Sequence, residues 1–219
     1  MHKIPIHQRV SKSFFRFLFK LLYTHFAWSY DWVAAFVSLG KWNTWVLSVL
    51  PYLKGESILE LGFGPGHLMH EMQKKGYHVV GLDASWQMCR RVSTVNDKKF
   101  ENGVIVNGYA QYVPFSNKSF ENIVATFPSD YIFNQATLSE IHRVLIPGGS
   151  LVVLPYAWIS SPRWFCPASS FLSKLSNFSS DWNSQYLTPI IQSGFEVNTE
   201  LIKNDSSSIV IIVAHKLID

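Results

Sequence analysis

Short apolar runs alternate with amphipathic stretches over most of the chain beyond residue 54. Five runs rich in Ile, Leu and Val predict strands buried on both faces, at residues 57–62, 78–83, 104–107, 122–127 and 150–155. Apolar positions with helical spacing predict three helices between them, at residues 66–75, 85–96 and 135–145. Strands and helices in this order predict an α/β fold on a parallel sheet, with Gly76 and Pro147-Gly148-Gly149 as helix stops.

The end of the chain departs from this alternation. Residues 194–203 and 207–216 are two β-rich runs joined by Asn204-Asp205-Ser206, which predicts an antiparallel hairpin that closes the sheet. We therefore expect two parts, an N-terminal basic aromatic arm at residues 1–54 and one domain over residues 55–219.

The arm is apolar, yet its charges argue against a simple membrane span. Arg16, Lys20 and Asp31 interrupt the stretch from Phe14 to Gly40 before about 18 uncharged apolar residues accumulate. Arg16 and Lys20 also break the apolar core that a signal peptide needs, and no small-residue cleavage site follows. The sequence therefore predicts a cytoplasmic protein.

A basic helix is predicted near the start of the arm. Lys12, Arg16 and Lys20 recur every four residues, which places them on one helical face. Two interpretations stay open. The aromatic side chains of the arm pack onto the body and leave the basic residues in water, or residues 1–22 make peripheral contact with a membrane surface.

Charge and composition narrow the function classes. The formal charge is +4, but it is unevenly distributed. Residues 1–54 hold seven Lys and Arg and one acid, whereas residues 55–219 hold 12 Lys and Arg and 14 acids. A mildly acidic body lacks the basic face that phosphate contacts require, so we expect no nucleic-acid partner. With 47% hydrophobic and 16% charged residues, disorder is excluded. Cys89 and Cys166 fit neither a zinc site nor a disulfide framework.

A glycine-rich turn follows the first predicted strand, with the sequence Glu60-Leu61-Gly62-Phe63-Gly64-Pro65-Gly66-His67. Glycines in such a turn adopt positive φ and let a ligand approach the backbone. The second strand ends in Asp83, 17 residues beyond Gly66, where a carboxylate can accept both hydroxyls of an adenosine ribose. Turn and acid together predict a nucleoside ligand.

The spacing of the turn disfavours a dinucleotide ligand. The dinucleotide fingerprint GxGxxG needs a third glycine at the position of His67, whose side chain would obstruct close packing of helix and strand below a pyrophosphate. A nicotinamide-dependent oxidoreductase is therefore disfavoured. His67 and His70 lie three residues apart, a spacing that suits a metal ion, but no third ligand is evident and we expect no metal.

Four segments resemble successive motifs of the class I S-adenosylmethionine-dependent methyltransferases, close to the branch of the quinone-biosynthesis methyltransferases. They are residues 60–66, residues 80–85, residues 114–115 with 119–121, and residues 143–149. The resemblance implies a Rossmann-like, mostly parallel seven-stranded sheet with an antiparallel last hairpin, helices on both faces and an N-terminal helical lid. It also implies S-adenosylmethionine as the cofactor.

The resemblance further assigns cofactor residues. It implies that Glu60 holds the cofactor's amino group directly or through water, that Asp83 binds the ribose hydroxyls, and that Ala84 and Ser85 flank the adenine. The full implied set is Glu60, Gly62, Phe63, Gly64, Gly66, Asp83, Ala84, Ser85, Gln111 and Phe127. Trp86 and Met88 are further candidates for the adenine slot, although a methionine there is more typical of the core.

One position departs from the family pattern. Many relatives have an acid after the glycine equivalent to Gly108, and that acid holds the adenine amino group, whereas this chain has Tyr109. A backbone carbonyl, the Gln111 side chain or stacking on Tyr109 can substitute, because adenine needs one acceptor and apolar faces. We expect cofactor binding to survive the change.

The residues on the acceptor side are hardest to identify, because in-line methyl transfer from a sulfonium has an activated leaving group and needs no dedicated base. We expect Asp130 and Tyr131, after the fourth strand, and Tyr30 and His25, in the arm, to serve there as catalytic residues. The alternative for Asp130 is an N-terminal cap of the helix after Asn134, and for the arm residues it is core packing.

The aromatic character of the arm and of residues 156–165 predicts an apolar pocket and a small, hydrophobic acceptor. The sequence thus predicts an enzyme, an S-adenosylmethionine-dependent methyltransferase. A second hypothesis is a catalytically silent protein of the same fold that binds a membrane or a protein partner through its arm. The acid that is missing at Tyr109 keeps this hypothesis open.

Overall fold

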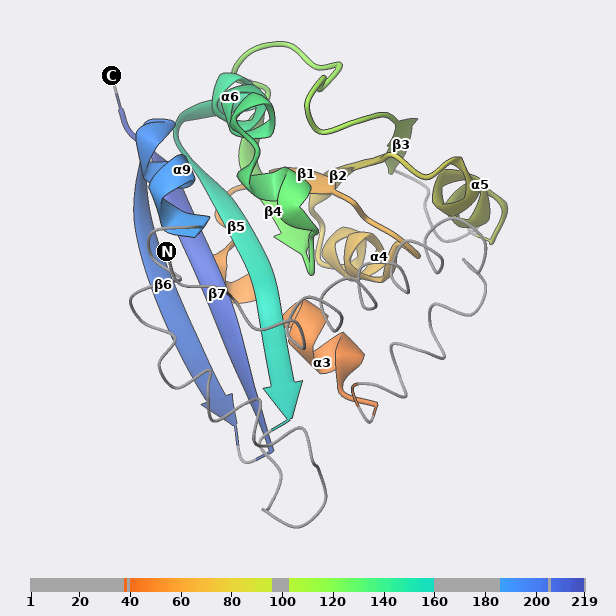
Figure 1. Ribbon diagram of the computed structural model, residues 1–219. Coiled ribbons are helices and arrows are strands. Elements are labelled where there is room, and N and C mark those ends of the chain that lie inside the picture. The colour runs from red at the N-terminus through yellow and green to blue at the C-terminus, as the bar shows by residue number, and fades with distance from the viewer. Residues whose placement is uncertain (1–37, 39, 96–102, 160–185, 205, 219) are drawn as a thin grey trace, which may run out of the picture.

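The computed structural model describes residues 38, 40–95, 103–159, 186–204 and 206–218. They form a seven-stranded sheet in the order β3-β2-β1-β4-β5-β7-β6 (Figure 1). The strands are β1 (Ser57–Leu61), β2 (His78–Asp83), β3 (Val104–Asn107), β4 (Phe120–Thr126), β5 (Leu145–Ile159), β6 (Phe195–Asn204) and β7 (Ser207–Lys216). Neighbours from β3 to β5 pair in parallel, and β7 is antiparallel to both β5 and β6. The predicted α/β sheet with an antiparallel last hairpin is confirmed.

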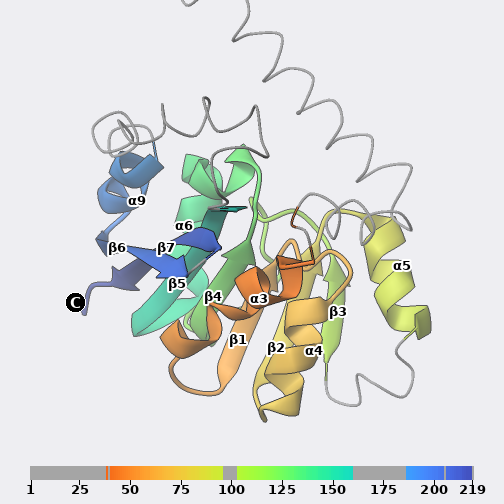
Figure 2. The same ribbon diagram turned by 90° about the horizontal axis from the view of Figure 1, so that it is seen from below.

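Helices cover both faces of this sheet. They are α3 (Trp42–Leu47), α4 (His67–Lys74), α5 (Trp86–Val95), α6 (Gln135–Val144) and α9 (Thr188–Gln192), with the short 3-10 helices η1 (Leu50–Tyr52) and η2 (Asp130–Phe133). Met69 of α4 and Met88 of α5 belong to the buried cluster on one face, which also includes residues of α3. Ile141 of α6 and Ile190 of α9 belong to the cluster on the other face (Figure 2).

Local sequence explains how the helices form. Leu68, Met69 and Met72 fall on one side of α4 and are buried, which is the pattern of a helix packed on a sheet. Gly76 adopts φ +90° just beyond this helix and ends it, as predicted. At the start of α6 the side chain of Asn134 accepts a hydrogen bond from a backbone N–H, which caps the helix.

The fifth strand is much longer than its predicted range. It begins at Leu145, directly after α6, so Pro147-Gly148-Gly149 lies inside the strand and not before it. A shift of register between Phe120 and Asn122 of β4 accommodates these extra residues as an irregularity. At its other end β5 runs to Ile159, because pairing with β7 continues there after pairing with β4 has stopped.

The last residues of the predicted arm belong to the core. Trp45, Val46, Val49 and Leu53 are buried in the same cluster as the side chains of α4. The predicted basic helix, within residues 1–22, and most of the predicted lid, residues 1–37 and 39 of 1–54, fall outside the described residues. In the part of the chain that the structure describes, no helix combines the length and the apolar character needed to cross a membrane. The division into an arm and a domain at residue 54 stays a prediction.

Candidate functional site

The glycine-rich turn lies at the carboxyl end of β1, where the strand order reverses. β1 has β2 on one side and β4 on the other, and such a switch point opens a crevice beyond the strand ends. Gly62, Gly64 and Gly66 adopt φ values of +71°, +54° and +79°. Gly62 has no room for a side chain, because a Cβ atom would lie 2.7 Å from the hydroxyl oxygen of Tyr131. The turn therefore presents bare backbone to the crevice.

Asp83 ties this turn to the end of β2. Its carboxylate accepts hydrogen bonds from the backbone N–H of Gly64 at 2.9 Å and of Ser85 at 2.7 Å. Its backbone carbonyl accepts from the N–H of Gly108 at 3.0 Å, which links β2 to the loop after β3. Burial raises the pKa of the Asp83 carboxyl, and the two N–H bonds oppose that rise. Each carboxylate oxygen retains acceptor capacity for a ligand hydroxyl.

Glu60 is the other acid of the site and is 1% exposed. Its Oε2 atom has no hydrogen-bond partner among the described residues. Burial raises the pKa of Glu60 well above its ordinary value of 4.5, the charge of Asp83 adds to the rise, and a hydrogen bond from the backbone N–H of Met69 opposes it. Such a carboxylate is costly to ionise alone, and a cationic hydrogen-bond donor would satisfy it.

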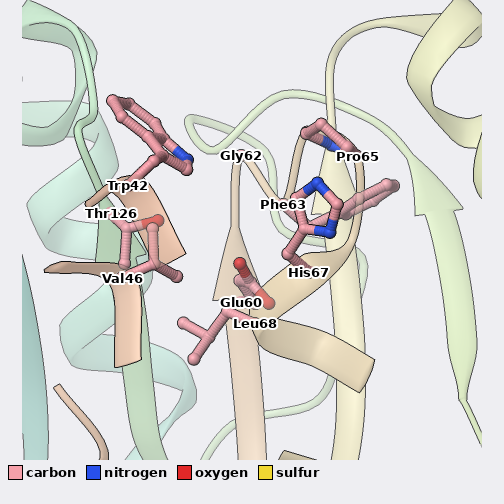
Figure 3. A pocket seen from close by; sticks show the side chains of 10 residues that line it. Trp42, Val46, Glu60, Gly62, Phe63, Pro65, His67, Leu68 and Thr126 are labelled. Carbon is pink, nitrogen blue, oxygen red and sulfur yellow. The ribbon is translucent and has the colours of Figure 1, made fainter. Parts of the chain in front are cut away.

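A pocket lies between α3 and the glycine-rich turn (Figure 3). Trp42 and Val46 of α3 form one wall, Pro65 and His67 stand opposite, and the Glu60 carboxylate lies between the two walls. The lining residues are Trp42, Val46, Glu60, Gly62, Phe63, Gly64, Pro65, His67, Leu68 and Thr126. Four of the predicted cofactor residues line this pocket, namely Glu60, Gly62, Phe63 and Gly64.

Trp42 is held in the pocket wall by Phe127. The two rings stack with centroids 4.3 Å apart and an angle of 25° between their planes. Phe127 adopts φ +49°, a conformation that is strained for a residue with a side chain and that clusters at functional sites. Phe127, which is predicted to touch the cofactor, thus supports Trp42, and Thr126 beside it lines the pocket.

Trp42, Val46 and His67 are not among the residues predicted to bind the cofactor. The sequence pattern that could have indicated Trp42 and Val46 is the aromatic, apolar end of the arm, but this pattern predicts only a lid and no individual pocket residue. Phe63 lines the pocket but is mainly a core residue, because it is only 4% exposed and packs in the buried cluster. A Cβ atom at Gly81 would lie 2.7 Å from that ring, so β2 passes close beneath it.

The predicted adenine side of the site is open. Ala84 is exposed, and the Trp86 and Tyr109 side chains beyond the ends of β2 and β3 are 63% and 64% exposed. Met88 is fully buried in the core, which agrees with the expectation from its residue type. Gln111 lies half-buried in the turn after β3. Among the described residues, the aromatic side chains of Trp86 and Tyr109 therefore lie where the adenine is expected.

Two of the four residues predicted on the acceptor side lie in the described part of the chain, and their roles stay predictions. Asp130 begins η2 and does not cap α6, because Asn134 provides that cap. Tyr131 donates its hydroxyl to the carbonyl of Leu61 at 3.1 Å, directly before the glycine-rich turn. Tyr30 and His25 lie outside the described residues.

Comparison with known proteins agrees with this geometry. A protein-family profile described as "Methyltransferase domain" matches residues 58–149. The demethylmenaquinone methyltransferase of Thermotoga maritima is 27% identical over an alignment of 206 positions that covers 82% of this chain and 88% of that protein. The demethylmenaquinone methyltransferase of Tropheryma whipplei is 32% identical over 61% of this chain, but the match covers 54% of its own length.

Solved structures share the fold at low sequence identity. A phosphoethanolamine N-methyltransferase of Haemonchus contortus, solved with S-adenosylhomocysteine, has a TM-score of 0.61 and 18% identity, covering 90% of this chain and 59% of that one. The [4+2]-cyclase SpnF has a TM-score of 0.59 and 14% identity, covering 81% of each chain. The motif order, the matched family profile and the named relatives agree that residues 58–149 of this chain lie in an S-adenosylmethionine-dependent methyltransferase domain.

Proposed function

We propose that the pocket between α3 and the glycine-rich turn holds the methionine part of S-adenosylmethionine. The observation that carries this assignment is the Glu60 carboxylate, which is buried and has an oxygen without a partner among the described residues. The α-ammonium group of the cofactor offers the positive charge and the hydrogen-bond donors that this carboxylate lacks. The bare backbone of Gly62 and Gly64 beside it leaves space for the methionine chain.

Asp83 holds the adenosine end in this proposal. Its carboxylate lies within hydrogen-bond distance of the turn and of Ser85, and it can accept ribose hydroxyls with its remaining lone pairs. The exposed rings of Trp86 and Tyr109 supply apolar faces for adenine in place of the acid that many relatives use.

The residues of the chain position the reactants more than they activate them. When bound, the cofactor supplies a methyl group on a sulfonium centre, which is an electrophile without further activation. The stacked rings of Trp42 and Phe127 give the pocket an apolar wall that excludes water from that centre. Orientation of an acceptor in line with the methyl group then contributes most of the rate, and a dedicated base is not required.

A small apolar ring compound of the quinone type is the acceptor that the relatives support. Those of Thermotoga maritima and Tropheryma whipplei are named for demethylmenaquinone, and the aromatic wall at Trp42 suits a flat ring. In this proposal, the part of the arm that precedes α3 serves as a lid that brings Tyr30 and His25 to the acceptor. Peripheral contact of residues 1–22 with a membrane would give the enzyme access to a lipid-soluble ring.

Calorimetric titration with S-adenosylmethionine and S-adenosylhomocysteine tests the cofactor assignment. We expect both to bind, and Asp83→Asn to weaken binding of each by about tenfold or more, because a ribose hydroxyl loses its charged acceptor. Glu196→Gln, an exposed acid on β6, is the control and should bind like the wild type. A folded wild-type protein that binds neither compound would refute the assignment.

Transfer of a radiolabelled methyl group to 1,4-dihydroxynaphthalene tests the acceptor class. Label that appears in a ring product supports the proposal. Because a cyclase shares this fold, the fold alone does not decide the reaction. Tight cofactor binding without transfer to any phenol, quinol or lipid acceptor would therefore favour the catalytically silent alternative.

A further inference from the structure

A pair of tyrosines lies beyond the carboxyl end of β4, outside the pocket described above. Tyr156 of β5 and Tyr186, just before α9, share a hydrogen bond between their side chains. Tyr156 follows Leu154, which is the last residue of β5 paired with β4 and lies opposite Thr126. Because β4 and β1 are parallel, this pair lies at the same edge of the sheet as the glycine-rich turn. Tyr156 is 42% exposed, so its side chain is accessible to a ligand.

The short helix η2 connects this pair to the cofactor pocket. At the pocket end, Tyr131 donates its hydroxyl to the carbonyl of Leu61. Two residues further on, the ring of Phe133 meets the ring of Tyr186 edge to face, with centroids 4.8 Å apart. One turn of backbone therefore spans from the cofactor pocket to the tyrosine pair.

Asp130 begins η2, whose last residue Phe133 packs on Tyr186, and the charge of Asp130 acts on Tyr156. We refer to Asp130, Tyr156 and Tyr186 as the polar cluster. Burial, the hydrogen bond to Tyr186 and the nearby charge of Asp130 together raise the pKa of Tyr156. Tyr156 is therefore a neutral phenol at physiological pH. The cluster offers hydroxyl groups that both donate and accept, beside a carboxylate that can only accept.

We propose that Asp130, Tyr156 and Tyr186 form the subsite that binds a hydroxyl group of the methyl acceptor. This assignment rests on the proposed methyl transfer. A hydroxyl group can donate to the carboxylate and accept from a tyrosine at the same time. An ether oxygen cannot donate, so it leaves the carboxylate facing a lone pair, and the subsite discriminates against it. Phe133 supports the ring of Tyr186 and leaves an apolar surface for the ring that carries the hydroxyl.

The test uses the full chain saturated with S-adenosylhomocysteine and two ring probes of similar shape. Under anaerobic conditions, 1,4-dihydroxynaphthalene and 1,4-dimethoxynaphthalene are titrated by calorimetry. We expect the wild type to prefer the dihydroxy compound by about tenfold or more, since one blocked hydroxyl leaves a polar group unpaired. Tyr156→Phe and Asp130→Asn should reduce this preference to within about threefold of unity. Tyr112→Phe, a tyrosine 81% exposed and outside the cluster, should keep it.

The affinity for S-adenosylhomocysteine separates this proposal from the proposed function. All four proteins should bind it equally, because the cluster lies outside the cofactor pocket. If the wild type does not bind S-adenosylhomocysteine, the proposed function itself is refuted. If binding is intact but the wild type shows no preference for the dihydroxy probe, or the variants keep it, the subsite is refuted. Tyr186→Phe keeps the ring against Phe133 and serves as a second variant. Should it fail to fold, Tyr156→Phe decides alone, because its side chain is exposed.

Discussion

Replacing Glu60 by Gln, its uncharged counterpart, should raise the free energy of unfolding of the free protein and lower its affinity for the cofactor. Below pH 4.5, the ordinary pKa of a glutamate, Glu60 is protonated in the folded and the unfolded chain. Its folded pKa is raised, so between pH 4.5 and that raised value the folded state keeps a proton that the unfolded state has lost. The free energy of unfolding then falls by about 1.4 kcal/mol per pH unit across this window. Gln does not ionise, so Glu60→Gln removes this loss of stability with rising pH.

Cofactor binding reverses this balance. The ammonium group of the cofactor favours ionised Glu60, so binding below the raised pKa releases one proton from this carboxyl. One proton corresponds to a tenfold gain in affinity per pH unit, or about 1.4 kcal/mol. Near pH 7, Glu60→Gln loses a hydrogen bond to a charged group, which should reduce the binding free energy by about 1.5–3 kcal/mol. The dissociation constant should then rise roughly tenfold to hundredfold.

The assay pairs calorimetric titration of S-adenosylhomocysteine between about pH 5 and 7 with thermal unfolding of the free protein. This range stays below the pKa of an α-amino group, about 7.7–8.0, so the ligand remains cationic. Glu71→Gln is the matched control, because this exposed acid on α4 has a pKa lowered by the hydrogen bond from Lys74. Equal pH slopes for the wild type and Glu60→Gln would show that Glu60 does not hold the ammonium group.

Three further substitutions test other parts of the site. Gly62→Ala should lower the free energy of unfolding by about 1–3 kcal/mol, measured by urea denaturation, because φ is +71° and the new Cβ meets the Tyr131 hydroxyl; adding Tyr131→Phe should recover part of the loss. Trp42→Ala should raise the dissociation constant of S-adenosylhomocysteine severalfold, and Trp42→Phe, which keeps a ring on Phe127, should restore most of it; equal affinities would remove Trp42 from the pocket wall. Asn134→Ala should cost about 1 kcal/mol of stability without changing cofactor affinity, whereas an affinity change would indicate that the start of α6 communicates with the pocket.

Local patterns predicted those parts of the fold that local physics determines. The strands β1, β2 and β4 are mostly buried, so their sequences form nearly continuous apolar runs. The prediction that β3 is buried on both faces is wrong, because β3 lies at the edge of the sheet and its residues are exposed or half-buried. The glycine-rich turn and Asp83 follow from spacing alone, since both lie at strand ends that are close in sequence. The outer half of β5 could not be predicted, because it exists through pairing between Tyr156 and Val210 in β7, far apart in the chain.

The site residues that escaped prediction depend on contacts between distant segments. Trp42 reaches the pocket because Phe127 stacks on it, and Phe127 does so in a strained conformation that no local preference favours. The raised pKa of Glu60 arises from burial and from Asp83 on the neighbouring strand, so it requires the sheet register as well as the sequence. The Tyr156 and Tyr186 pair joins β5 to the start of α9 and likewise has no sequence signature.

The order of the sheet divides the site into two halves. Glu60 on β1 pairs with Gly81 on β2 and with Val124 on β4, so β1 lies between the two halves. The β2 side carries Asp83, and the β4 side continues into η2 and the tyrosine pair. Because the parallel strands β1, β2 and β4 all end at one edge, a cofactor bound across β1 and β2 and an acceptor bound beyond β4 meet over the end of β1. Under the proposed assignments, methyl transfer therefore occurs at the carboxyl end of β1, which carries the glycine-rich turn.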